Sequence, residues 1–98
     1  MEIEKLESIL ADLLTEKFGG VFETVAQVGL SWRHVHLNNG TCYLSFHTSL
    51  MEAASKKEVK DKVSRWIERD SDLIKEGAWL SYDEHGEPLL KGKSSTFK

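Results

Sequence analysis

The feature that most constrains the fold is an Asn-Gly pair at 39–40, which separates two segments of alternating apolar and polar residues. Asn-Gly is the preferred pair for a two-residue type I′ turn, because both central residues of that turn need a positive φ. The sequence therefore predicts a β-hairpin over residues 32–47. A two-residue loop would place Leu37 directly opposite Cys42.

The two faces of this hairpin differ in chemistry. An even-length loop keeps alternate side chains together, and one face is then apolar, with Cys42 and Phe46 among its members. We expect that face to point inward and the Cys42 thiol to be buried and unreactive. The other face carries aromatic, imidazole and hydroxyl groups: Trp32, His34, His36, Tyr43, Ser45 and His47. We expect its rings to contact a partner, because aromatic side chains contribute most to protein interfaces.

Helical and strand patterns around the hairpin predict the fold class. Apolar residues recur at three- and four-residue steps over 3–18 and again over about 55–69, which favours two amphipathic helices. Strand patterns occupy 21–29, 30–37, 41–47, 79–82 and, as an edge strand, 88–90. The order α-β-β-β-α-β-β predicts an α+β fold. We expect an antiparallel sheet of three to five strands, with the N-terminal and central helices packed on one face.

Length and composition limit the class of protein. The chain has 98 residues, 40% of them hydrophobic, and a formal net charge of −3, which suits one domain with one core. We expect that domain over 1–90 and a flexible basic tail over 91–98. The single cysteine excludes an internal disulfide. No apolar run approaches the roughly 18 residues of a membrane span, and the acidic start does not resemble a signal peptide. A cytoplasmic protein without membrane contact is expected.

Sequence patterns of catalysis are missing from the chain. It contains no phosphate-binding Gly-x-x-x-x-Gly-Lys, no Gly-x-Gly-x-x-Gly and no nucleophile elbow. So short a chain also has difficulty enclosing a deep pocket. We therefore expect a non-enzymatic module without a cofactor that binds another protein, as an adaptor, a chaperone-like cap or an inhibitor of an accessory or phage-borne kind. Homodimerisation through the same hairpin face is an alternative.

A zinc site is a second alternative for the hairpin. His34-x-His36 is a metal-ligand spacing on a strand, because alternate residues project to one side. His47, on the neighbouring strand, could supply a third imidazole. Three imidazoles around Zn²⁺ would leave a fourth position open for water. No carboxylate or carbonyl that would orient these ligands can be identified from the sequence.

A lysine cluster, Lys56, Lys57 and Lys60, opens the second predicted helix in the run Ser-Lys-Lys-Glu-Val-Lys. Lysines in a first turn oppose the helix dipole and suit that place best when an anion is bound there. This run and the element order over about 3–67 resemble double-stranded-RNA-binding domains, whose last helix opens with Ser-Lys-Lys-x-Ala-Lys. The resemblance implies that the lysine cluster contacts phosphates across the major groove. The chain lacks that family's Gly-Pro-x-His loop and small alanine pair, and its flanks are acidic. Nucleic-acid binding is therefore an alternative to protein binding.

Overall fold

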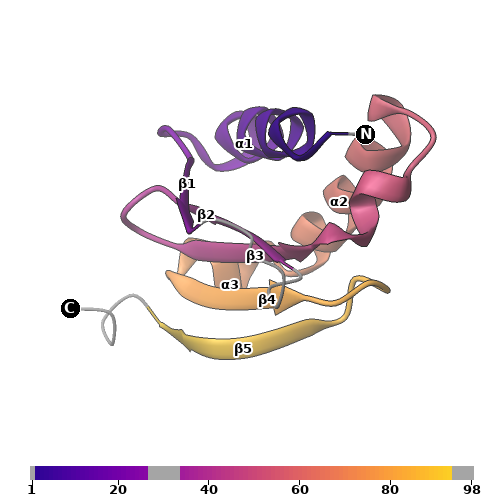
Figure 1. Ribbon diagram of the computed structural model, residues 1–98. Coiled ribbons are helices and arrows are strands. Elements are labelled where there is room, and N and C mark those ends of the chain that lie inside the picture. The colour runs from indigo at the N-terminus through magenta and orange to yellow at the C-terminus, as the bar shows by residue number, and fades with distance from the viewer. Residues whose placement is uncertain (1, 27–33, 94–98) are drawn as a thin grey trace.

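The computed structural model of the protein describes residues 2–26 and 34–93. Its elements in chain order are α1 (Ile3–Phe18), β1 (Glu23–Ala26), β2 (His34–Asn38), β3 (Tyr43–His47), the 3-10 helix η1 (Thr48–Glu52), α2 (Lys56–Arg69), α3 (Ser71–Lys75), β4 (Ala78–Tyr82) and β5 (Pro88–Lys93) (Figure 1). The predicted α+β fold and the order α-β-β-β-α-β-β are confirmed, with the short η1 and α3 added before and after α2.

The strands form one five-stranded sheet in the order β1-β2-β3-β4-β5. β1, β2 and β3 are antiparallel neighbours, and β5 returns antiparallel to β4. β3 and β4 are parallel, so the sheet is mixed and differs from the predicted antiparallel sheet at this one pair. The difference arises because the connection through α2 and α3 crosses over the sheet and brings β4 back in the direction of β3.

Both long helices pack on the same face of the sheet, as their apolar stripes predict. The buried residues of α1 are Leu6, Ile9, Leu10, Leu13 and Leu14, and those of α2 are Val59, Val63 and Ile67. Alternate strand residues complete the same core cluster: Val35, Leu37, Leu44, Phe46, Ala78, Leu80 and Tyr82. α1 lies beside the β1–β2 end of the sheet and β5 forms the opposite edge (Figure 1).

The β2–β3 hairpin has the predicted faces but not the predicted register. Leu37 pairs with Leu44 rather than with Cys42, so the loop is the four residues 39–42 instead of two. Because the shift is two residues, every side chain keeps its predicted face. Phe46 and Cys42 are 0% and 4% exposed. Burial raises the pKa of the Cys42 thiol to about 11, which agrees with an unreactive cysteine.

Asn39 explains the wider loop. A type I′ turn needs a positive φ at both central residues, but in the described chain only glycines have one, and Gly40 has a φ of 88°. The Asn39 side chain instead accepts hydrogen bonds at Oδ1 from the backbone N–H groups of Thr41 and Cys42, at 3.1 and 3.2 Å. Such a side-chain bridge replaces the backbone hydrogen bond of a tight turn.

Two predicted boundaries differ at the ends of the sheet. β5 continues to Lys93, so residues 91–93 belong to the sheet rather than to the predicted flexible tail. β1 begins at Glu23, so residues 21 and 22 precede the strand that was predicted over 21–29. Residues 27–29 of that strand, the first residues of the strand predicted over 30–37, and Trp32 lie outside the described residues.

Stacked rings connect α2 to β3 and β4. The ring of Tyr82 stacks on Phe46, with centroids 5.2 Å apart, and on Trp66, with centroids 5.9 Å apart. Burial, together with the Asp70 carboxylate, raises the pKa of Tyr82, and its hydroxyl donates to Asp70 Oδ2 at 3.0 Å. Gly86, in the β4–β5 turn, packs so closely on the Trp66 indole that a Cβ there would collide with the ring.

Arg69 and Asp83 hold the same turn in place. Arg69 Nη2 donates to the Gly86 carbonyl at 2.7 Å and pairs with Asp70 Oδ2 at 2.9 Å. Asp83 Oδ1 accepts the backbone N–H groups of Glu87 and His85, at 2.9 and 2.8 Å. The turn therefore presses Gly86 against α2, and this contact joins the β4–β5 hairpin to the helical layer.

We expect Gly86→Ala to lower the free energy of unfolding by about 2–4 kcal/mol, because collision with Trp66 adds to the strain of a positive φ. Gly40→Ala is the matched control. Gly40 also has a positive φ, but no atom lies within 4 Å of its Cβ position, so strain alone should cost about 1–2 kcal/mol. Urea denaturation followed by circular dichroism measures both values. Equal losses in the two variants would contradict the packing account.

Candidate functional site

The sheet face opposite the long helices carries the side chains that the sequence predicts for partner contact. Four of these side chains are half-buried: His34 and His36 on β2, and Tyr43 and His47 on β3. Val35 and Leu37, which alternate with them on β2 and point the other way, are buried. Trp32, the fifth predicted contact residue, lies outside the described residues. The described members of the predicted site therefore share one face.

Rings on this face form a continuous row across three strands. The centroids of neighbouring rings are 5.4 Å apart for His47–His34, 6.2 Å for His34–His36, 6.1 Å for His36–Tyr43 and 5.0 Å for Tyr43–Trp79. Rings attract one another at such separations. We call these five side chains the ring row. It spans β2, β3 and β4 on a face that no helix of the described chain covers.

Trp79 belongs to the ring row although the sequence did not predict it as a contact residue. It lies between the buried Ala78 and Leu80, so alternation alone indicates that it points away from the core. The contact of Trp79 with Tyr43 could not be predicted, because the two residues lie side by side only through the parallel pairing of β3 with β4. No sequence pattern specifies the register of two strands that are separated by a crossover.

The centre of the ring row favours uncharged side chains. Desolvation lowers the pKa of His36 and raises the pKa of Tyr43, and both shifts stabilise the neutral form. Ser45, which pairs with His36 across the two strands, is fully buried. Its hydroxyl lies 2.6 Å from His36 Nδ1. This hydrogen bond fixes the orientation of the imidazole in the row.

His47 also has a structural task at the end of β3. Its Nδ1 accepts the backbone N–H of Ser49 at 3.0 Å and so caps η1. An imidazole nitrogen that accepts a hydrogen bond carries no proton, so His47 is held as the tautomer with hydrogen on Nε2. The sequence did not predict this cap, because histidine is not among the preferred N-cap residues.

The side-chain geometry does not favour the zinc alternative at His34, His36 and His47. Residues 2–26 and 34–93 hold no group of three histidine, cysteine, aspartate or glutamate side chains that could bind a metal ion. The three imidazoles share a face, but their planes are tilted by 43° and 86° to one another and two of their Nδ1 atoms are engaged within the protein. The three imidazoles are therefore neighbours on the sheet, but their ring nitrogens are not directed toward one common point where a metal ion could bind.

An exposed leucine extends the face beyond the ring row. Leu89 on β5 pairs with Ser81 on β4, and Ser81 follows Trp79 by two residues and so shares its side of the sheet. Leu89 is 57% exposed. The apolar character of the ring row therefore continues to the edge of the sheet.

The lysine cluster lies at the start of α2, in the helical layer. Its first two lysines are exposed and Lys60 is half-buried. Ser55 Oγ accepts the Glu58 N–H at 3.2 Å, and Glu58 Oε2 accepts the Ala54 N–H at 2.8 Å. Serine and glutamate together thus cap the helix. The Glu58 carboxylate occupies the place at the helix N-terminus that a phosphate would take, which weighs against phosphate binding there.

Comparisons of the chain with protein families, with curated proteins and with solved structures give no match. Among residues 2–26 and 34–93, none of the helices has the length and apolar character needed to cross a membrane. What the chain does must therefore be inferred from its own geometry.

The lowered pKa of His36 predicts a pH dependence of stability. In an unfolded chain a histidine titrates near pH 6.5, whereas folded His36 takes up its proton at a lower pH. The unfolded state binds more protons between these two pKa values, so the free energy of unfolding should fall as the pH drops below about 6.5. An NMR titration of the imidazole Cε1–H resonances should place the His36 midpoint below that value.

His36→Gln should then lose less stability than the wild type between about pH 7 and pH 5.5. Lys57→Gln is the control, because Lys57 is exposed at the start of α2, away from His36, and this variant should keep the wild-type dependence. A His36 midpoint at or above about 6.5 would refute the desolvation argument.

Proposed function

We propose that the protein is a non-enzymatic interaction module that binds another protein through the ring row. The observation that carries this proposal is the row itself, in which five rings make continuous contacts across β2, β3 and β4. The row lies on the face opposite the helices and includes Tyr43 and Trp79, two residue types that are enriched at interface centres. Aromatic side chains are enriched among the residues that contribute most to binding.

The physical state of the ring row also supports binding. Each ring is half-buried and held by its neighbours, so little side-chain entropy remains to be lost when a partner docks. Neutral His36 and Tyr43 can be covered without the cost of burying a charge. Leu89 adds exposed apolar area on the same face. A sheet face of this kind offers the broad, shallow surface that stable interfaces use, about 800 Å² for each partner.

The Ser45–His36 hydrogen bond has the geometry of a nucleophile with its base. Its length of 2.6 Å is within the range of such pairs. Ser45, however, is 0% exposed, so a substrate carbonyl has no path to the hydroxyl. We therefore assign this pair the task of orienting His36 in the ring row, which supports a binding role rather than acyl transfer.

We expect Tyr43→Ala and His34→Ala to weaken partner binding while the domain stays folded. Both side chains are half-buried on the face opposite the core, and truncation of an interface aromatic costs more than about 1 kcal/mol, or about fivefold in Kd. Lys57→Ala is the matched control, because Lys57 is exposed in the helical layer and should bind as the wild type does. The measurement is co-purification of the tagged variants from the native host, with and without nuclease.

A stoichiometric, nuclease-resistant protein that is retained by the wild type and by Lys57→Ala, and is lost from Tyr43→Ala, supports the proposal. Sedimentation velocity of the same samples identifies a second copy of the chain as the partner if Tyr43→Ala dissociates a dimer. Loss of all bound material on nuclease treatment would contradict the proposal and favour the lysine cluster. Unfolding of Tyr43→Ala or His34→Ala would show that the faces of the sheet are assigned wrongly.

A further inference from the structure

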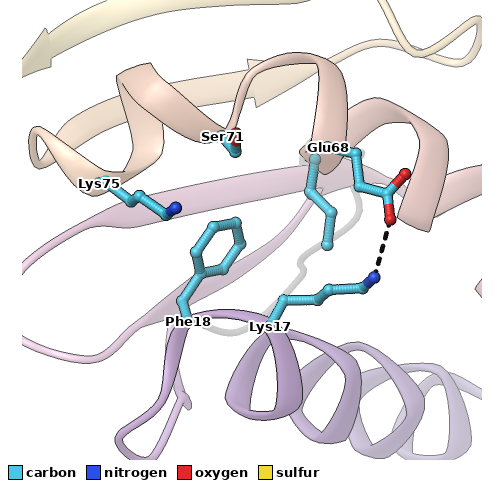
Figure 2. A pocket seen from close by; sticks show the side chains of 6 residues that line it. Lys17, Phe18, Glu68, Ser71 and Lys75 are labelled. Atoms are coloured by element: carbon cyan, nitrogen blue, oxygen red, sulfur yellow. Dashed lines mark hydrogen bonds and ion pairs between the residues drawn. The ribbon is translucent and has the colours of Figure 1, made fainter.

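A shallow pocket of about 210 Å³ lies in the helical layer, where the ends of α1 and α2 meet α3 (Figure 2). Six residues line it: Lys17, Phe18, Ile67, Glu68, Ser71 and Lys75. None of them belongs to the ring row or to the lysine cluster. The pocket is therefore a separate feature of the surface.

Two helix ends and one ion pair form this pocket. α1 stops at Phe18, since Gly19 takes a φ of 77°. α2 stops at Arg69, and the chain turns into α3 at Ser71. Lys17 Nζ lies 2.9 Å from Glu68 Oε1, and this ion pair joins α1 to α2 along one side of the pocket (Figure 2).

The floor of the pocket is apolar. Ile67 is fully buried in the core, and Phe18 is half-buried and packs against it as part of the same core. The Phe18 ring lies between the Lys17 and Lys75 side chains in Figure 2. An apolar group that entered the pocket would rest on the ring and displace water from it, which is favourable.

The rim carries a cation that the protein does not neutralise. Lys17 is compensated by Glu68, whose hydrogen bond and charge raise the pKa of Lys17. Lys75 has no hydrogen bond or ion pair with any residue that the structure describes. Its ammonium group points toward the space above the Phe18 ring (Figure 2). Two lysines against one glutamate leave the lining with a surplus of one positive charge.

We propose that this pocket binds an aromatic or branched apolar side chain that stands next to a carboxylate in a partner polypeptide. The apolar group lies on the Phe18 ring, and the carboxylate pairs with Lys75. The volume decides between classes of ligand. Sites for cofactors and drug-sized molecules measure about 300–1,000 Å³, whereas 210 Å³ accommodates a single side chain. Because the pocket is in the helical layer, this second contact does not depend on the ring row.

The test is an NMR titration of the full chain with three blocked peptides. Acetyl-Gly-Phe-Glu-Gly-amide carries both groups, acetyl-Gly-Phe-Gln-Gly-amide lacks the charge, and acetyl-Gly-Ala-Glu-Gly-amide lacks the ring. The first should cause saturable shifts of the amide resonances of Phe18, Ser71 and Lys75, with a Kd of about 1 mM, as expected of so small a contact. Removal of the charge should weaken binding about two- to fivefold, and removal of the ring should abolish it.

Lys75→Gln should erase the preference for the glutamate peptide over the glutamine peptide, whereas the control Lys57→Gln should keep it. Both lysines are exposed, so neither change endangers folding. The proposal is overturned by the absence of saturable shifts at the pocket up to about ten times the expected Kd, by shifts confined to the ring row, or by an unchanged preference in Lys75→Gln. None of these results bears on binding at the ring row, which the Tyr43 and His34 variants test.

Discussion

One apolar core, shared by the two long helices and a single face of the sheet, determines where everything else lies. α1, α2 and alternate strand residues contribute to the same cluster, and burial of apolar area stabilises it by about 25 cal/mol per Å². Because successive side chains of a strand point to opposite faces of the sheet, burial of the apolar residues in this core places the residues between them on the opposite face. The position of the ring row is thus a consequence of where the core forms.

The register of β3 against β4 couples the core to the candidate site. The pairing that sets Phe46 beside Tyr82, and so allows the stack with Trp66, also sets Tyr43 beside Trp79 on the other face. A slip of one residue would move both pairs at once. The close contact of Gly86 with Trp66 holds the β4–β5 hairpin against α2, so the last member of the ring row is positioned from within the core.

The spacing of apolar residues along the chain was sufficient to predict the helices and the two faces of the hairpin. The helix over 3–18 and the inward direction of Cys42 and Phe46 follow from the spacing of apolar residues. The structure departs from the prediction where a side chain competes with the backbone or where distant strands pair. Asn39 widens the hairpin loop by accepting backbone hydrogen bonds. The position of Trp79 beside Tyr43 and the orientation of the imidazoles on the sheet face depend on contacts between elements.

Binding of a partner on the ring row is most directly tested by a photo-reactive residue in that row. Tyr43→p-benzoylphenylalanine places the probe in the row, and Lys57→p-benzoylphenylalanine places it on the exposed start of α2. After irradiation in the native host, mass spectrometry identifies what each position contacts. We expect one protein adduct, from a partner or a second copy of the chain, at position 43 and none at position 57. Adducts at position 57 without any at position 43 would contradict binding through the ring row.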